Sequence, residues 1–295
     1  MDTKISSVAP SANLSPYLYG MIAIVCGALM NATVKGLSAC ASIILITSWR
    51  YALGAVIALL AYACFRPTLP GWNAVPFHLL RGAIQITTAV TFFWAISRIP
   101  LATATALSFT GVLMIAPVAR IILKEPMKPI VIGATFVGFL GALLIIIGEA
   151  RLFDENATHD VLGYLAPLFS SLCYSVSVVL LRYRSRSEDS AAIAFFANTL
   201  PALYVLPVFF ILPAATTEGI YPWFLLAGLF GVSFWSLTTL SYAGAPAARL
   251  APLNYTQLIW AALIGFFLFN EAPHWQTWVG AGVIIASCLY VARRG

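Results

Sequence analysis

Ten apolar stretches, each close to the length that crosses a lipid bilayer, run through this 295-residue chain. A transmembrane helix needs about 20 consecutive apolar residues. The chain is 61% hydrophobic and only 9% charged, and a soluble domain cannot hide that much apolar surface. The sequence therefore predicts an all-α integral membrane protein with ten transmembrane helices. The predicted spans are 17–35, 42–64, 75–96, 101–123, 129–149, 161–182, 190–212, 221–242, 248–269 and 275–292.

Residues 97–147 and 243–293 follow one shared sequence pattern. In each copy a proline opens an apolar span, a turn that carries a glutamate closes it, and a second span with an early glycine follows. The residues that match at one constant offset are Pro100 with Pro246, Thr110 with Thr256, and Glu125 with Glu271, and the early glycines are Gly133 and Gly280. A weaker match relates Gly20 to Gly163 and supports a duplication of the whole half.

The repeat predicts how the chain is organised. If each half holds five spans, an odd number, the two copies have opposite topology and enclose a central cavity, as in many secondary transporters. We expect a disordered tail over 1–15, a first five-helix repeat over 16–149, a connecting loop over 150–160, and a second five-helix repeat over 161–295.

The basic residues predict the orientation of the bundle. The net charge of +6 does not indicate nucleic-acid binding, because the Lys and Arg residues lie in the connections between apolar spans. Cytoplasmic connections of membrane proteins are enriched in these residues. With both termini in the cytoplasm, only Arg98 and Arg151 fall clearly outside, and we expect a multi-pass protein of the inner cell membrane. The residues that then lie inside are Lys4, Arg66, Arg81, Arg120, Lys124, Lys128, Arg182, Arg184, Arg186, Arg249, Arg293 and Arg294.

Other classes of protein receive little support from the sequence. The five cysteines and three histidines show no metal or redox spacing, so we expect no cofactor and no catalytic residues. An intramembrane enzyme is a remote alternative, as is a channel, since no filter-like loop or ring of charges is evident. The expected partners are a small-molecule substrate and the lipid bilayer, without nucleic acid, and a monomer fits the pattern.

Two stretches carry a resemblance to a known family. They read RGAIQITTAVTFFWAISRIPLATATALSFTGVLMIAPVARIILKEP (81–126) and LSYAGAPAARLAPLNYTQLIWAALIGFFLFNEAP (240–273). With ten spans in a five-plus-five repeat, the chain resembles the drug/metabolite transporter (DMT) superfamily, EamA-like exporters in particular. Within it, the chain is most similar to bacterial aromatic amino acid exporters of the YddG type. The resemblance implies alternating access through a cavity lined by spans 1, 3, 4, 6, 8 and 9, with spans 5 and 10 at the periphery.

Polar and aromatic residues inside the spans are the candidates for substrate binding. A polar group at membrane depth faces either a cavity or a neighbouring helix, and aromatic walls suit an apolar substrate body. Lys35 is able either to pair with a substrate carboxylate or to extend to the outer interface, and Arg81 is expected to anchor at the cytoplasmic interface. The candidates are Asn31, Lys35, Gln85, Thr88, Phe92, Tyr174, Trp235, Thr239, Asn254, Tyr255 and Gln257.

These observations predict a membrane transporter that exports small amphipathic metabolites, namely aromatic and other apolar amino acids. Export of other metabolites or drugs, such as purines and cationic compounds, is the alternative. A phosphate-ester substrate would need several cations, whereas only Lys35 and Arg50 are available. No Asp or Glu falls at the centre of a span. Coupled carriers usually keep a carboxylate there, so facilitated diffusion is favoured.

Overall fold

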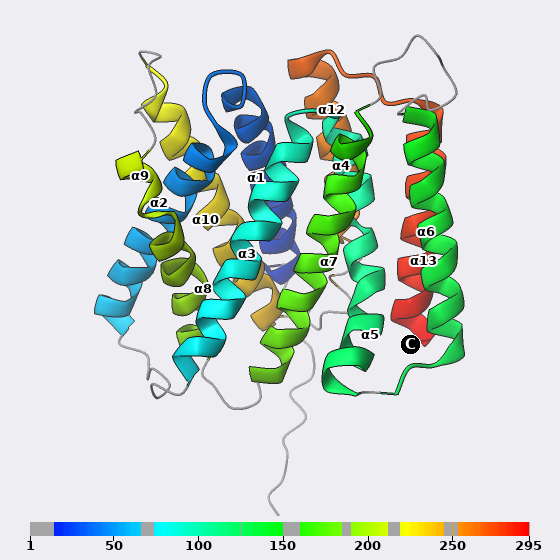
Figure 1. Ribbon diagram of the computed structural model, residues 1–295, viewed down its shortest axis with the longest axis horizontal. Helices are drawn as coiled ribbons and strands as arrows, with labels where there is room; N and C mark the ends of the chain where they lie inside the picture. The colour runs from blue at the N-terminus through cyan, green and yellow to red at the C-terminus, as the bar shows by residue number, and fades with distance from the viewer. Residues whose placement is uncertain are drawn as a thin grey trace, which may run out of the picture.

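The computed structural model describes residues 15–65, 74–124, 126–149, 160–184, 190–211, 219–244, 250 and 253–294. Throughout these residues the regular secondary structure is helical, and the helices stand side by side in one bundle (Figure 1). The expected disordered tail and most of the connecting loop lie outside the described residues. The helices are α1 Ser15–Leu37, α2 Ile43–Phe65, α3 Val75–Ile96, α4 Leu101–Ser108, α5 Thr110–Leu123, α6 Pro129–Glu149, α7 Val161–Arg184, α8 Ser190–Val205, α9 Val208–Ile211, α10 Tyr221–Gly244, α12 Gln257–Phe269 and α13 Trp275–Arg294.

The predicted membrane spans are confirmed in the described residues. Eight helices are long and apolar enough to cross a membrane, and two shorter apolar segments, Phe195–Ile211 and Gln257–Phe269, lie within the seventh and ninth predicted spans. The fourth span is divided into α4 and α5 at Phe109, and the seventh is divided into α8 and α9 just before Val208. The second break is explained by Pro207, which has no backbone N–H to continue the helix.

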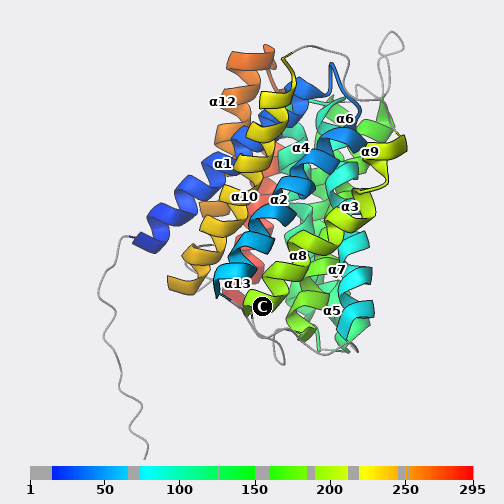
Figure 2. The ribbon, with the colours of Figure 1, turned by 90° about the vertical axis from the view of Figure 1, so that its left-hand side faces the viewer.

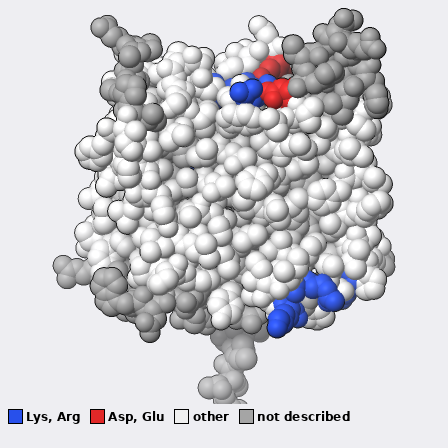
Figure 3. Space-filling model, in the orientation of Figure 1, with Lys and Arg blue, Asp and Glu red and all other residues white. Residues whose placement is uncertain are grey.

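The surface of the bundle is that of a membrane protein. Figure 3 shows Lys and Arg side chains at the lower end of one face, both acidic and basic side chains at its upper end, and a wide band between them without either. Large apolar side chains such as Phe136, Phe210 and Phe267 are exposed. In lipid these side chains meet hydrocarbon, so their exposure carries no penalty.

The two halves are related as inverted repeats. Exchanging α1 with α7, α2 with α8, α3 with α10, and α5 with α12 maps several of the main helix packing pairs onto one another. Thus α1 packs on α10 and α12, whereas α7 packs on α3 and α5, and the pair α2 and α10 corresponds to the pair α8 and α3. In Figure 1, α1 rises from the lower end of the bundle and α7 descends from the upper end. The first helices of the two halves therefore run in opposite directions.

Local backbone geometry repeats at the offset read from the sequence. The hydroxyls of Thr110 and Thr256 each donate a hydrogen bond of 2.7 Å to the carbonyl three residues earlier. Lys124 and Asn270 end α5 and α12 in the same left-handed conformation, each with φ of 54°. A left-handed conformation is uncommon for a residue with a side chain, so its recurrence at the matching position indicates one turn used twice. Glu125, which follows Lys124, lies outside the described residues.

The helices α6 and α13 form a tightly packed pair at one side of the bundle (Figure 1), the side turned away from the viewer in Figure 2. A Cβ added to Gly280 would lie 2.5 Å from the carbonyl oxygen of Gly141, and one added to Gly141 would lie 2.8 Å from that of Gly280. Gly133, the early glycine that corresponds to Gly280 in the sequence pattern, takes no part in this contact, because nothing lies within 4 Å of a Cβ added there. Close approach of the two backbones is what the glycines permit.

Candidate functional site

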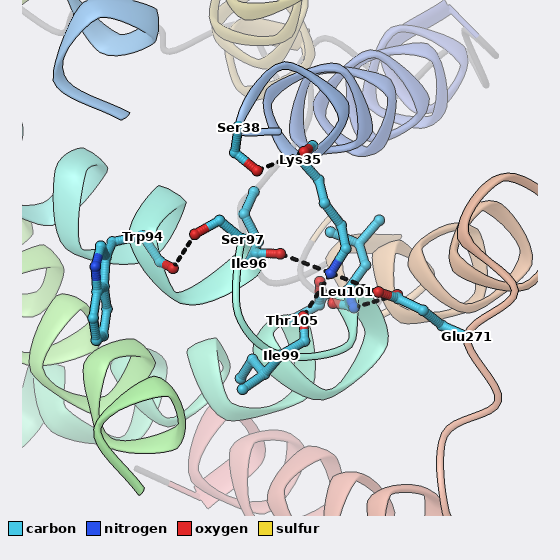
Figure 4. Close-up of polar contacts among 9 residues, drawn as sticks. All are labelled: Lys35, Ser38, Trp94, Ile96, Ser97, Ile99, Leu101, Thr105 and Glu271. Atoms are coloured by element: carbon cyan, nitrogen blue, oxygen red, sulfur yellow. Dashed lines mark hydrogen bonds and ion pairs between the residues drawn. The ribbon is translucent and has the colours of Figure 1, made fainter. Parts of the chain in front are cut away.

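A largely buried ion pair connects the two halves of the bundle at its upper end. Lys35 lies in the last turn of α1, and its Nζ is 2.5 Å from Oε1 of Glu271, which follows α12. The same ammonium donates hydrogen bonds of 2.7 Å to the carbonyl oxygens of Ile96 and Ile99 (Figure 4). Ile96 is the last residue of α3, where helical carbonyls lack partners and the helix dipole favours a cation, and Ile99 lies in the connection from α3 to α4. All three N–H donors of Lys35 are thus occupied.

Glu271 holds the other side of this cluster. Its Oε2 accepts a hydrogen bond of 2.8 Å from the backbone N–H of Leu101, the first residue of α4. A carboxylate at a helix N-terminus satisfies an unpaired donor and complements the helix dipole. Only 12% of the Lys35 side chain and 15% of the Glu271 side chain are exposed. The cluster of Lys35, Glu271, Ile96, Ile99 and Leu101, which we call the upper latch, therefore joins α1, the α3–α4 connection and the end of α12.

A broad, open depression lies beside the upper latch. It has a volume of ≈ 530 Å³ and is bordered by Lys35, Phe269, Arg98 and the small residues of the turn after α1. Nη1 of Arg98 pairs with Oδ2 of Asp160 at 3.2 Å, and its guanidinium covers the ring of Trp94 at 4.4 Å. The Arg98 side chain is 48% exposed. This second pair is consequently a surface contact, unlike the upper latch.

Glu149 is a second buried carboxylate at the upper end, and the sequence analysis did not single it out. Its Oε1 accepts hydrogen bonds from the backbone N–H of His274 at 2.9 Å, from the hydroxyl of Thr103 at 3.3 Å and from the hydroxyl of Thr277. The hydroxyl of Tyr164 donates to its carbonyl oxygen at 3.1 Å. Glu149 thereby connects the end of α6 to α4, α7 and α13, so its contacts are those of a structural tie.

The three candidate residues of α3 lie in different environments. The Oε1 atom of Gln85 is buried without a hydrogen-bond partner, and the Gln85 backbone carbonyl accepts a 3.3 Å bond from the hydroxyl of Tyr51. Thr88 donates to the carbonyl of Ile84 within its own helix at 2.8 Å. Phe92 packs against the central apolar core. Of the three, Gln85 is the one with a buried polar atom left available.

Other candidates from the first half and from α7 and α10 also differ in environment. Asn31 is 4% exposed, and its Oδ1 atom has no hydrogen-bond partner. Tyr174 lies against Gly111 of α5, because a Cβ on that glycine would be 3.3 Å from the tyrosine ring. Trp235 is 44% exposed beside Phe234, with 5.3 Å between the ring centroids. The side chain of Thr239 lies outside the described residues.

The ninth predicted span contributes three candidates near its break. Asn254 is exposed, and Gln257 begins α12 with a partly buried side chain. Tyr255 contacts Phe109 edge to face, with 5.3 Å between the ring centroids. Because Phe109 marks the α4–α5 break and Tyr255 precedes α12, this aromatic pair joins the corresponding breaks of the two repeats. The role of the predicted residues in substrate binding stays a prediction.

Two arginines are more deeply buried than the sequence analysis expected. Arg81, expected as an anchor at the interface, is only 7% exposed. Arg50, which the sequence analysis named only as an available cation, is 9% exposed between α1, α3 and α10. Burial in a bundle depends on which helices cover a residue, and the local sequence does not contain that information.

The chain is similar in sequence to known membrane transporters and in fold to a solved structure. The profile of the EamA-like transporter family matches residues 14–147 and again residues 161–293. A riboflavin transporter of Brucella anthropi is 26% identical over 257 residues, which cover 85% of this chain and 88% of that protein. The pseudopaline exporter CntI of Pseudomonas aeruginosa is 26% identical over 272 residues, with 90% and 91% covered. One solved crystal structure has the same fold, with a TM-score of 0.62 at 21% identity over 95% of this chain and 97% of the other.

Proposed function

This chain belongs to the EamA-like transporter family, and from that premise we propose that it exports small amphipathic metabolites, namely aromatic and other apolar amino acids. The family match makes the protein a multi-pass membrane transporter within the drug/metabolite transporter superfamily. The family match does not by itself establish the finer parts of the proposal. These are the substrate class, the direction of transport, the inner-membrane location with both termini in the cytoplasm, the monomeric state and the division into repeats at 16–149 and 161–295.

The observation that carries the substrate proposal is a pair of buried amide oxygens without partners. They are Oδ1 of Asn31 on α1 and Oε1 of Gln85 on α3. A buried polar atom without a hydrogen bond is costly in a protein interior and more so in lipid. An amide oxygen accepts hydrogen bonds, so the ammonium group of an amino acid is a suitable partner. Aromatic side chains such as Phe92 and Tyr255 would then face the apolar part of the substrate.

The upper latch supports a carrier that works by alternating access. Lys35 belongs to the first half and Glu271 to the second, so opening the upper end requires the ion pair to break. A carrier of this kind exposes its site to one side at a time by moving one repeat against the other. In the proposed cycle the latch closes the upper, extracellular end. The expectation that Lys35 contacts the substrate remains a prediction, because in this conformation its donors are occupied by the latch.

The test is counterflow of labelled substrates in proteoliposomes. We expect L-phenylalanine, L-tryptophan and L-leucine to be exchanged, and Gln85→Ala and Asn31→Ala each to weaken apparent affinity roughly two- to tenfold, the effect of losing one neutral hydrogen bond. Trp278→Ala, on the exposed face of α13, is the control and should transport like the parent. Full activity of both amide variants would show that these residues serve only packing.

A second candidate function is export of a different metabolite or drug. The relatives named above are a riboflavin transporter and a pseudopaline exporter, so the family does not fix one chemical class of substrate. The counterflow panel therefore includes riboflavin, adenine and a cationic dye. Exchange of one of these without exchange of any amino acid would replace the amino acid proposal with this alternative.

A further inference from the structure

Arg50 is a buried cation in the interior of the bundle. It lies seven residues after Ile43, the start of α2, which is a rise of about 10 Å along the helix. The residue is 9% exposed. An unpaired charge at membrane depth is costly, and such residues usually pair with a carboxylate or face a ligand pathway. The group that compensates the charge of Arg50 therefore bears on the function of the protein.

The surroundings of Arg50 supply little that satisfies a guanidinium. Its Nε lies 3.2 Å from the thioether sulfur of Met30, a weak acceptor, and its Cζ lies 4.8 Å from the ring centroid of Tyr51 and 5.6 Å from that of Phe93. Nη1 is buried and has no hydrogen-bond partner. Among the described residues, the ion pairs with carboxylates are Lys35–Glu271 and Arg98–Asp160, and neither includes Arg50.

The aromatic rings hold the guanidinium in place without neutralising it. Faces of Tyr and Phe attract a cation but accept no conventional hydrogen bond. On the side of α10 the neighbour is Gly231, where an added Cβ would lie 3.0 Å from Nε of Arg50 and 3.2 Å from the sulfur of Met30. The glycine therefore leaves room for the arginine side chain. The result is a fixed cation with an unused N–H donor between four helices.

We propose that Arg50 binds the carboxylate of the transported substrate. This inference rests on the proposed function of the chain as a carrier of amphipathic substrates, and it adds the chemical group that such substrates must bear. The planar guanidinium matches a carboxylate with two parallel N–H donors. Asn31 and Gln85 offer unsatisfied acceptors, and Arg50 offers an unsatisfied donor. Together they suit the ammonium and the carboxylate of a zwitterion.

The experiment compares probes that differ only in the carboxylate. L-phenylalanine, L-phenylalaninamide and phenethylamine compete with labelled L-phenylalanine in proteoliposomes. We expect the parent to prefer L-phenylalanine over the other two, and Arg50→Gln to reduce that preference 10- to 100-fold, as for a lost hydrogen bond to a charged group. Arg120→Gln, an exposed arginine of α5, is the matched control and should keep the parent preference.

A binding measurement separates this inference from the proposed substrate. Purified parent protein should be thermally stabilised by phenylacetate and less by 2-phenylethanol, and Arg50→Gln should lose the difference. Amino acid exchange with an unchanged preference in Arg50→Gln would overturn the inference and leave the proposed function intact. Absence of amino acid exchange, with Arg50-dependent stabilisation by phenylacetate, would overturn the substrate proposal and support the carboxylate site.

Two further variants keep the test valid if Arg50→Gln does not fold. Arg50→Lys retains the charge but loses the paired donors, so an intermediate loss of carboxylate preference is expected. Gly231→Ala leaves Arg50 in place but moves its guanidinium, because the new methyl group would lie 3.0 Å from Nε. Unchanged preference in both monodisperse variants would show that Arg50 serves helix packing alone.

Discussion

Replacing Glu271 by glutamine tests the upper latch directly. Glutamine keeps an oxygen that is able to accept the hydrogen bond from the N–H of Leu101, now 2.8 Å from the carboxylate. It removes the negative charge that lies 2.5 Å from Nζ of Lys35. The variant therefore leaves the cap of α4 nearly intact and leaves the Lys35 ammonium buried without its counter-charge.

The expected loss of stability of the closed upper end follows from how little of the Lys35–Glu271 pair is exposed. Removing one partner of a buried ion pair costs about 3–5 kcal/mol, because the other charge stays buried and uncompensated. Lys35 and Glu271 retain 12% and 15% exposure, and Lys35 keeps its bonds to Ile96 and Ile99, so we take about 2–3 kcal/mol. When the upper end opens, water solvates Lys35 and the penalty disappears. The open population should therefore rise roughly 30- to 150-fold.

The assay measures how fast a cysteine beneath the latch reacts with a thiol reagent. Thr105 is 1% exposed and lies one turn beyond Leu101 on α4, so Thr105→Cys in a background without the native cysteines reports opening. When opening is fast relative to labelling, the rate follows the open population. Purified protein in detergent allows the reagent to reach both ends of the bundle.

Two controls decide whether loss of the upper latch causes the faster labelling of the Thr105→Cys reporter. Arg98→Gln breaks the pair with Asp160, whose partners are 48% and 34% exposed. Such surface pairs contribute about 0–1 kcal/mol, so labelling should rise less than about fivefold.

The second control combines Lys35→Met with Glu271→Gln. This double variant leaves no buried unpaired charge and should reverse much of the increase in labelling rate caused by Glu271→Gln alone. Equal labelling of the parent and Glu271→Gln would refute the latch.

Three more expectations follow. With Cys40 as the sole cysteine, an impermeant thiol reagent should label intact cells from outside; Lys128→Cys should react only after the membrane is opened, and the reverse pattern would overturn the orientation. Gly280→Leu should lower the free energy of unfolding of the purified protein by about 1–3 kcal/mol through overpacking, because its Cβ would lie 2.5 Å from the carbonyl oxygen of Gly141. Gly133→Ala, in open space, should not lower it, and thermal unfolding of both variants is the measurement. Downhill flux in proteoliposomes should continue after the proton gradient is collapsed, since no Asp or Glu lies at the centre of a predicted span; flux that stops without the gradient would indicate coupling to protons.

The sequence predicted the spans well because bilayer thickness sets a length that local composition is able to meet. The predicted start of the fifth span, residue 129, and of the tenth, residue 275, are the first residues of α6 and α13. The repeat offset was equally informative, since Thr110 and Thr256 make the same local bond. The resemblance to the superfamily is confirmed by the match to the EamA-like transporter family. The narrower likeness to YddG-type amino acid exporters stays a prediction, because the relatives compared carry other names.

What the sequence alone determined, then, is the position and order of the membrane spans and their inverted repetition, because apolar length and turn residues act locally. The breaks that divide the fourth and seventh spans into separate helices came from the structure. Tertiary structure alone decided which charges are compensated. The sequence left Lys35 two roles, pairing with a substrate carboxylate or extending to the outer interface, whereas the fold brings it to Glu271 and two carbonyls from far along the chain. Arg50 has the same local composition whether it faces lipid, water or protein. Only the packing of α1, α3 and α10 around it leaves its Nη1 buried and unpaired, since burial is a property of the assembled bundle.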